Sequence, residues 1–401
     1  MQKTPPRITY LARSFLDYRI PVFQALDSML EGRLSVLYSA VWTPPRVQQK
    51  AAAALGERAI ALSGEKRIGD GRASKEMANA KLCIAYQPGL LKALAQTRPD
   101  VVISDGFFKW TFFAILHKLR HRVPVVVCYE RTFHTERGAQ WYRRLYRRAA
   151  VKLVDAVCCN GRLSAEYTRW LGVPEGRIVT GHMAADTDAL RRQAERVPPH
   201  VRNALRAQLG VEGLALVYVG QLIRRKGVRE LLEGWRLLEH SDPRAATLLI
   251  VGEGGEEQEL RALAGQLGLQ SVRFLGRVKY DEIARYYAAS DAFVMPTLED
   301  NWSLVVPEAM ACGLPVLCSQ YNGCWPELID PGSNGWVFDP LNRDDVHRVL
   351  KLSVEHRDRL RQMGGRSKEI VSRHSPCTAA ESIVRACEIA MTRRRKKGLT
   401  A

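Results

Sequence analysis

The sequence of 401 residues has no continuous run of roughly 18 apolar residues, so no membrane-spanning helix is expected. Residues 1–15 also lack the apolar segment of a secretory signal peptide and fit a first β-strand instead. No repeat with a period of roughly 20–50 residues recurs, which argues against a solenoid. A chain of this length is expected to form about two domains with sizeable cores.

Cysteine pairs with the C-x-x-C spacing are also missing, although the chain has nine cysteines. None of them forms a C-x-x-C motif, and Cys312, Cys318 and Cys324 are evenly spaced without the close pairing of a zinc site. A chain of this size does not need disulfides to stabilise it. We therefore expect free thiols in the core, a reducing cytoplasmic environment and no metal.

Acidic residues are scarce in the first half of the chain only. Residues 1–195 contain 31 Lys and Arg but 17 Asp and Glu, whereas residues 196–401 contain 29 and 25. The run RRRKK at 393–397 accounts for the excess in the second half. This asymmetry predicts a negatively charged partner for the first half, either nucleic acid or an anionic membrane face.

Short aliphatic segments alternate with helical stretches throughout, which is typical of α/β layers with parallel sheets. The pattern restarts after a polar stretch at 190–201 that contains Pro198 and Pro199 and predicts an interdomain linker. We expect two α/β domains with a cleft between them and with ligands at the carboxyl ends of the strands. The predicted strands are 8–12, 34–39, 101–104, 123–129, 156–160, 177–181, 214–220, 247–254, 272–278, 291–295 and 315–319.

The segment 296–316, PTLEDNWSLVVPEAMACGLPV, joins an acidic loop to a predicted helix whose first turns contain Ser303, Leu304 and Val305. A helix N-terminus has unpaired N–H groups and the positive end of a dipole, which suit a phosphate group. A carboxylate farther along, such as Glu308, can accept hydrogen bonds from sugar hydroxyls. The segment therefore predicts a site for a diphosphate and a ribose, formed by Asp300, Asn301, Trp302, Ser303, Leu304, Val305 and Glu308.

This segment resembles the donor-binding motif of glycosyltransferase family 4, E-G-F-G-L-V-x-x-E-A-M-A-x-G-x-P-V. The match over LVVPEAMACGLPV is close, and the departures are Asp300 for Glu, Asn301 for Gly, Trp302 for Phe and Ser303 for Gly. The resemblance implies a GT-B fold, in which two Rossmann-like domains with parallel sheets face each other across a cleft and a C-terminal helix returns to the first domain. A buried connection in any doubly wound domain is the alternative explanation. The implied domains are 1–195 for the acceptor, 196–375 for the nucleotide sugar, and 376–401 for the returning helix and basic tail.

The resemblance also implies a reaction, namely transfer of a sugar from a nucleotide diphosphate with retention and without a metal or other cofactor. Glu308 would hold the ribose, Asp300 the donor sugar and Lys226 the diphosphate. Two alternatives remain open: a GT-B epimerase or phosphorylase, and a nucleic-acid-binding protein, for which no motif with stacking aromatics is present.

Glycine-rich turns after three predicted strands extend the donor side. VGQLIRRKG at 219–227 resembles the family pattern G-R-L-x-x-x-K-G, so Lys226 corresponds to the phosphate-binding lysine, while Gln221 stands where the family has an arginine. Arg224 or Arg225 can supply the missing cation. The resemblance further implies that backbone near the base includes Gly220, Gly254, Arg277 and Val278.

Two acidic residues near the predicted domain boundary, Asp186 and Asp188, match the D-x-D motif of a metal site. In family 4 the corresponding V-D-T closes the first domain, and we interpret the pair as structural.

Acceptor-side residues are harder to assign, because the family signal fades in the first half. Arg19 lies near the end of the loop after the first strand, Asp105 follows strand 101–104, and Glu130 stands where many members have a histidine. We assign Arg19, Asp105, Glu130 and His134 to the acceptor or sugar side, with structural ion pairs as the alternative for Glu130 and His134.

The helix at 140–154, QWYRRLYRRAAVKLV, combines aromatic residues with five basic residues. Such a basic amphipathic helix predicts binding to an anionic membrane surface, and a core helix with a solvated arginine face is the alternative. We expect a peripheral enzyme on the cytoplasmic face of a membrane, acting on a lipid-linked or glycan acceptor rather than on nucleic acid.

Overall fold

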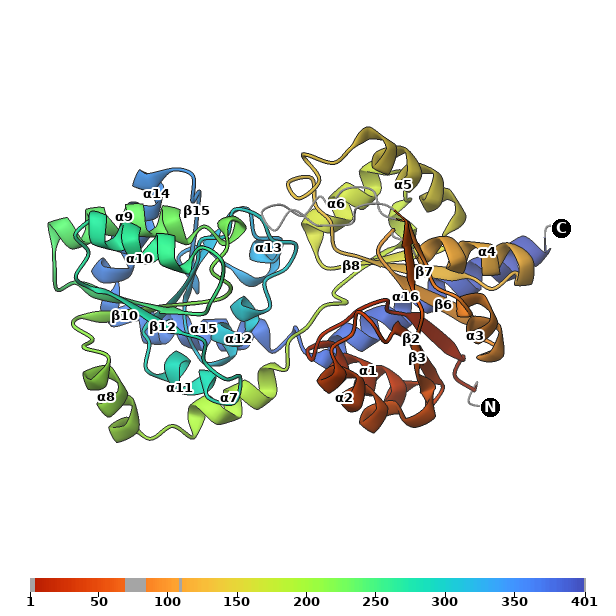
Figure 1. The fold of residues 1–401 in the computed structure, drawn as a ribbon, viewed down its shortest axis with the longest axis horizontal. Helices are drawn as coiled ribbons and strands as arrows, with labels where there is room; N and C mark the ends of the chain where they lie inside the picture. The colour runs from red at the N-terminus through yellow and green to blue at the C-terminus, as the bar shows by residue number, and fades with distance from the viewer. Residues whose placement is uncertain (1–3, 69–83, 108–109, 400–401) are drawn as a thin grey trace. The chain divides into compact units, whose positions relative to one another are not determined.

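Two compact α/β units make up the computed structural model, which describes residues 4–68, 84–107 and 110–399 (Figure 1). Unit 1 comprises the chain up to Ala184 and the C-terminal helix from Pro376, and unit 2 comprises Ala185–Ser375. The side chains of residues 395–399 and Cys83 lie outside the described part, so the basic tail is described only as far as Arg394.

Unit 1 is built on a seven-stranded parallel sheet with strand order β3-β2-β1-β6-β7-β8-β9. The strands are short and apolar because both faces of the sheet are covered, as parallel sheets require. They are β1 (Ile8–Leu11), β2 (Leu34–Ser39), β3 (Ala59–Leu62), β6 (Val101–Asp105), β7 (Val125–Tyr129), β8 (Ala156–Cys159) and β9 (Ile178–Thr180), beside a hairpin of β4 (Lys66–Ile68) and β5 (Ile84–Tyr86).

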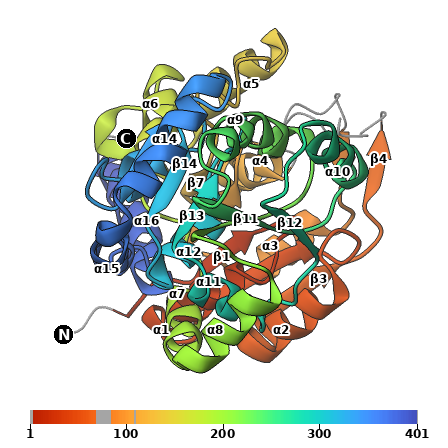
Figure 2. The same cartoon turned by 90° about the vertical axis from the view of Figure 1, so that its left-hand side faces the viewer.

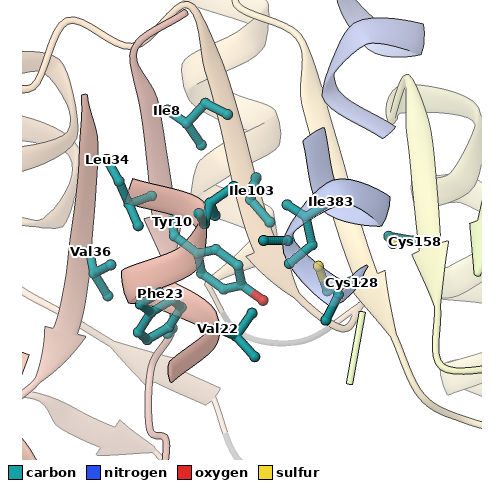
Figure 3. Packing of buried hydrophobic residues seen from close by; sticks show 14 of the residues in the cluster. Ile8, Tyr10, Val22, Phe23, Leu34, Val36, Ile103, Cys128, Cys158 and Ile383 are labelled. Atoms are coloured by element: carbon teal, nitrogen blue, oxygen red, sulfur yellow. The ribbon is translucent and has the colours of Figure 1, made fainter. Parts of the chain in front are cut away.

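Helices cover the two faces of this sheet in two separate clusters. One cluster contains the helices α1 (Arg19–Met29), α2 (Pro45–Leu55) and α16 (Pro376–Leu399). Ile383 of α16 packs near Tyr10 and Cys128 (Figure 3), so the C-terminal helix is part of the core of unit 1. The other cluster contains α3 (Leu90–Gln96), α4 (Thr111–His121), α5 (Trp141–Leu153) and α6 (Arg162–Trp170).

Unit 2 is also built on a parallel sheet, which has six strands in the order β12-β11-β10-β13-β14-β15. The strands are β10 (Leu214–Val219), β11 (Ala246–Val251), β12 (Val272–Gly276), β13 (Ala292–Met295), β14 (Val316–Ser319) and β15 (Gly335–Phe338). In Figures 1 and 2 the helices α9 (Val228–Ser241), α10 (Glu257–Gln266) and α14 (Arg343–Glu355) lie on one face. The remaining helices are α7 (Thr187–Glu195), α8 (Pro199–Gln208), α11 (Ile283–Ala288), α12 (Val305–Ala311), α13 (Trp325–Leu328) and α15 (Leu360–Val371).

The strand predictions are confirmed within one to three residues at each end, but three features differ. Strands β3, β4, β5 and β15 were not predicted. The polar stretch at 190–201 is not an extended linker, because it contains the end of α7 and the start of α8. The units divide between Ala184 and Ala185, ahead of α7, whereas the sequence placed the division at 195–196.

The described cysteines are all free thiols, and most are buried, as expected for core residues. Among the helices in the described ranges, none combines the length and the apolar character needed to cross a membrane.

Candidate functional site

The centre of the donor-side prediction is an ion pair between Lys226 and Asp300. Lys226 ends the 3-10 turn η3 (Arg224–Lys226) that follows β10, and Asp300 lies in the loop after β13, the strand next to β10. The Lys226 Nζ is 2.5 Å from the Asp300 Oδ2, and the two side chains are 12% and 13% exposed. Residues 74 positions apart in sequence therefore meet because their strands are neighbours in a parallel sheet.

Asp300 is held in its ionised form. Burial pushes the pKa of Asp300 upward, but the Lys226 ammonium and a hydrogen bond donated by the Ser303 Oγ (2.6 Å) outweigh it and leave the pKa below its ordinary value. The Trp302 N–H donates to the other carboxylate oxygen at 3.1 Å. Asp300 is consequently a fixed negative charge that holds Lys226 in place.

Close backbone contacts fix the turn that carries Lys226. The Arg225 carbonyl accepts hydrogen bonds from the Leu298 N–H (2.8 Å) and the Thr297 Oγ1 (2.9 Å). Gly227 has a φ of +69°, and a Cβ there would lie 2.0 Å from the Pro296 carbonyl oxygen. Only glycine can occupy this position without displacing the loop that carries Asp300.

Asn322 connects the acidic loop to the loop after β14. The buried Asn322 Oδ1 accepts from the Ser303 N–H at 3.3 Å, and the Gly323 N–H donates to the Asp300 carbonyl at 3.0 Å. Helix α12 begins at Val305, so the prediction that Ser303 lies in the first helical turn is wrong. Ser303 instead donates to Asp300, and Leu304 forms the N-cap.

Glu308 lies in the first turn of α12 and is part-buried. Burial raises the pKa of Glu308 to about 7, although the Tyr280 and Tyr287 hydroxyls oppose this shift. The Tyr280 hydroxyl lies 3.5 Å from the Glu308 Oε1. No motif assigned Tyr280 to the site. This residue lies in the loop after β12.

The other predicted donor residues follow the carboxyl ends of β10, β11, β12 and β13, and so lie along the same edge of the sheet. Gln221 is exposed and its carbonyl accepts from the Tyr218 hydroxyl at 2.8 Å. A Cβ at Gly254 would lie 2.2 Å from the Leu222 carbonyl oxygen, so this glycine allows two turns to pack together. Arg277 is exposed and pairs with Glu253 at 3.3 Å. The remaining members of the set are Gly220, Val278, the part-buried Asn301 and the buried Trp302.

Arg19 is the centre of the residues predicted for the acceptor side. It begins α1, is 3% exposed, and its Nη2 lies 3.5 Å from the Asp105 Oδ1 and 3.4 Å from the Glu130 Oε1. Asp105 also accepts from the Tyr10 hydroxyl at 2.6 Å. Burial raises the pKa of Asp105 despite these two partners. Asp105 ends β6 and Glu130 follows β7, so both lie at the carboxyl edge of the sheet of unit 1.

His182 completes this group and was not predicted. Its Nδ1 is 3.4 Å and its carbonyl oxygen is 3.3 Å from the Arg19 Nη1. Because 163 positions separate the two residues, no local pattern could have revealed the contact. His134 lies in the turn after β7, where its carbonyl accepts from the Arg137 N–H at 3.3 Å.

Asp186 and Asp188 are placed at the start of α7. The Asp186 carboxylate accepts from the Ala189 N–H at 3.3 Å and so caps the helix, while Asp188 pairs with Arg191. Within the described ranges, no group of three or more His, Cys, Asp or Glu side chains is arranged to hold a metal ion.

Helix α5 differs from its prediction in one respect. Arg147 does not belong to a solvated basic face, because it is 2% exposed and forms a two-point ion pair with the buried Glu136. The exposed face carries Trp141 (74% exposed) and Leu145 (61% exposed). Next to them lie Arg144, Arg148 and Lys152, all exposed.

A pocket at the opposite, amino edge of the unit 2 sheet is lined by Glu212, Arg236, Glu239 and Arg273. This pocket lies where β10, β11 and β12 begin, and not where they end. The loops after strands hold the Lys226 and Asp300 pair, and ligands of open parallel sheets bind at that edge. We therefore place the candidate site there.

Two family models match the chain, glycosyl transferases group 1 over residues 202–370 and a glycosyl transferase 4-like domain over residues 74–184. The first match includes Lys226, Asp300 and Glu308. The second includes Asp105, Glu130 and His182.

Curated relatives are similar over most of the chain. The sequence is 29% identical over 261 residues to O-antigen chain mannosyltransferase B of Escherichia coli, covering 63% of this chain and 66% of that protein. It is 28% identical over 310 residues to D-inositol 3-phosphate glycosyltransferase of Streptomyces bingchenggensis, covering 70% of this chain and 65% of that protein. Each alignment spans slightly less than two thirds of the relative's own length.

A solved structure, that of HepE from Anabaena in complex with UDP, resembles the whole chain. The TM-score is 0.73 at 19% identity, with 95% of this chain and 99% of that chain covered. At this identity the likeness shows a shared fold.

Proposed function

The chain belongs to the glycosyltransferases with a GT-B fold and resembles family 4 among them, and from this premise we propose that it transfers a sugar from a nucleotide diphosphate donor to a glycan or lipid-linked acceptor, with retention at the anomeric carbon. One observation carries the proposal. Lys226 and Asp300, which we assign to the diphosphate and the sugar of the donor, form a part-buried ion pair at the carboxyl edge of the unit 2 sheet.

Lys226 can hold Asp300 and a diphosphate at the same time. An ammonium group has three N–H donors, and Asp300 Oδ2 uses one of them. The others can meet the phosphate oxygens, where a charged hydrogen bond is stronger than a neutral one. The positive charge then stabilises the leaving diphosphate in a site that needs no metal ion for this purpose.

Glu308 is the residue that we assign to the ribose. Its ionised carboxylate accepts hydrogen bonds only, which suits a pair of ribose hydroxyls. Because its pKa is about 7, a positively charged group or a hydroxyl pair that binds it favours the ionised form. Nucleotide binding at pH 7 is therefore expected to release part of a proton.

In the proposed reaction, the bond between the anomeric carbon and the terminal phosphate oxygen breaks while the acceptor oxygen bonds to the same face of that carbon. The acceptor proton passes to the departing phosphate oxygen, so no protein side chain has to act as the general base. Asp300, through its fixed position, would orient the donor sugar for this step.

For the location of the enzyme, we propose peripheral attachment to the cytoplasmic face of an anionic membrane. The exposed face of α5 supports this, because Trp141 and Leu145 form an apolar stripe next to Arg144, Arg148 and Lys152. A relative named for the O-antigen chain favours a cell-envelope glycan as the acceptor.

The test is a screen of UDP- and GDP-sugars against glycoside acceptors, with release of nucleoside diphosphate as the readout and NMR of the product anomer as the measure of stereochemistry. We expect acceptor-dependent release with one donor and a retained configuration. An inverted product contradicts the proposed mechanism. Formation of a free sugar phosphate or an epimer without acceptor would favour the epimerase or phosphorylase alternative.

A further inference from the structure

Tyr280 is an exposed aromatic residue beside the acid that we assign to the ribose. It lies in the loop between β12 and α11 and is 57% exposed. Its hydroxyl oxygen is 3.5 Å from the Glu308 Oε1. The same loop carries Arg277 and Val278, which the resemblance to family 4 places beside the base. Tyr280 therefore belongs to the loop that links the predicted base site to the predicted ribose acid.

The contact between Tyr280 and Glu308 is loose. A hydrogen bond from a hydroxyl to a carboxylate is usually about 2.5–2.7 Å long, so a separation of 3.5 Å leaves this one weak. More than half of Tyr280 is exposed, and few packing contacts hold its ring in place. Because exposed side chains change rotamer within nanoseconds, the hydroxyl can leave Glu308 readily.

Glu308 has acceptor positions to spare. Among the described residues, the Tyr280 hydroxyl is the one donor within hydrogen-bond distance of its carboxyl group. The second hydroxyl that lowers the pKa of Glu308, that of Tyr287, is buried and has no hydrogen-bond partner in the part of the chain that the structure describes. An ionised carboxylate can accept about four hydrogen bonds. Most of this capacity is therefore available to a ligand.

A ribose hydroxyl is chemically equivalent to the tyrosine hydroxyl at this position. Both are O–H donors, and both stabilise the ionised form of a carboxylate that accepts from them. A ribose presents two hydroxyls on adjacent carbons, which can meet the two oxygens of one carboxylate. A pair of close donors would thus replace one distant donor, and the ribose and Tyr280 would compete for the Glu308 Oε1.

We propose that Tyr280 is a displaceable stand-in for a ribose hydroxyl: in the free protein its hydroxyl contacts the Glu308 Oε1, and it leaves when a nucleotide binds. This inference rests on the proposed function, which assigns Glu308 to the ribose. Tyr280 is then a positioning residue, because it keeps the carboxylate turned toward the place of the ribose. It also limits the affinity for the nucleotide by competing with it.

Calorimetry on the full chain at pH 8 tests this proposal, since Glu308, with a pKa of about 7, is then largely ionised. The probes are UDP, GDP and ADP, each paired with its 2′,3′-dideoxy counterpart, which lacks both ribose hydroxyls. Tyr280→Phe keeps the ring and removes the hydroxyl. We expect this variant to bind the ribonucleotide roughly two- to tenfold more tightly, because one competing hydrogen bond is lost. Its affinity for the dideoxy nucleotide should be unchanged, because that ligand does not displace Tyr280.

Tyr286→Phe is the matched control. It removes a hydroxyl from the adjacent helix α11, where the Tyr286 ring lies against the Arg285 guanidinium, and it should leave both affinities unchanged. A ribonucleotide affinity of Tyr280→Phe that equals the wild-type value or is weaker overturns the inference. Equal tightening for the ribonucleotide and the dideoxy nucleotide also overturns it, since the tyrosine would then act on the base or the diphosphate and not on the ribose.

Failure of the proposed function gives different results. Equal affinity of the wild-type protein for a ribonucleotide and its dideoxy counterpart would contradict the assignment of Glu308 to the ribose. Binding of none of the three ribonucleotides would contradict the donor site itself. A wild-type preference for the ribonucleotide that Tyr280→Phe does not increase would contradict this inference alone.

Discussion

The two units share one architecture but differ in what they leave exposed. Among the described residues, all but three of the exposed large hydrophobic side chains belong to unit 1, and the three in unit 2 are Val201, Tyr280 and Leu341. Unit 2 carries the ion pair and the glycine turns of the proposed donor site. Unit 1 carries a carboxylate-rich edge and the apolar, basic surface of α5.

The contrast between buried and exposed residues is clearest within α5, where Arg147 is buried and its neighbour Arg148 is exposed. Arg147→Ala should destabilise the protein by about 3–5 kcal/mol, because it leaves the Glu136 carboxylate buried without its main partner. Arg148→Ala removes an exposed side chain that stacks over Trp170 and should cost about 1 kcal/mol or less. Urea denaturation followed by circular dichroism measures both. Equal losses would show that Arg147 belongs to the surface after all.

The donor side of unit 2 depends on Lys226. Lys226→Ala should weaken binding of a nucleoside diphosphate by about 1.5–3 kcal/mol, roughly 10- to 150-fold, because a charged hydrogen bond is lost. Binding of the matching nucleoside should change little. Calorimetry with UDP and uridine, and with GDP and guanosine, measures this difference, and the exposed Lys351→Ala serves as control. An equal loss for diphosphate and nucleoside would remove Lys226 from the diphosphate site.

The surface of unit 1 is tested by its charges. Replacing Arg144, Arg148 and Lys152 by Gln should weaken binding to anionic vesicles by on the order of 1 kcal/mol for each charge, since basic residues near such a surface contribute about that much. The same substitutions at Arg244, Lys351 and Arg361 of unit 2 should have no effect. Sedimentation with vesicles that contain or lack phosphatidylserine gives the answer. Wild-type protein that ignores anionic vesicles at low salt would contradict membrane attachment.

Substitution of Glu308 should have the smallest effect, and it should raise the free energy of unfolding instead of lowering it. Because its pKa is raised to about 7, the folded protein keeps this proton in a range where the unfolded chain has released it. The carboxyl group therefore costs no stability below its unfolded pKa. The cost grows as the pH rises from that value to about 7 and is constant above it. Glu308→Gln should raise the free energy of unfolding at pH 8 by on the order of 1 kcal/mol relative to wild type, with no gain at pH 4.

The same Glu308→Gln variant should bind nucleoside diphosphate more weakly at pH 8, since a carboxamide also donates and cannot serve both ribose hydroxyls as an acceptor. Thermal denaturation at the two pH values gives the stability, and calorimetry gives the affinity. A variant that is destabilised at pH 8, or that binds with unchanged affinity, would be inconsistent with a buried ribose-binding acid.

Periodic features of the sequence were sufficient for most of the fold. Apolar strands such as 34–39 and 214–219 lie in the core of parallel sheets, and their composition identifies them without tertiary information. Strand β15 was missed because GWVF follows a loop rich in glycine and proline, and β3 because four residues after a helix give no clear period.

The site could be predicted only where a motif carried it. The motif identified Lys226, Asp300 and Glu308 by type and spacing, but the ion pair between the first two follows from strand order in the sheet. His182 lies outside any motif, and its contact with Arg19 joins segments that are far apart in the sequence. Arg147 could have been recognised, because it falls on the same helical face as the buried Ala150 and Val151.

The central claim is that the donor binds at the carboxyl edge of the unit 2 sheet, and hydrogen–deuterium exchange with and without a nucleoside diphosphate tests it most directly. The account predicts slower exchange in peptides that cover 219–227 and 299–308, with little change around the amino-edge pocket lined by Glu212 and Glu239. Protection at that pocket, or in unit 1 alone, with no change at 219–227 and 299–308, would contradict it.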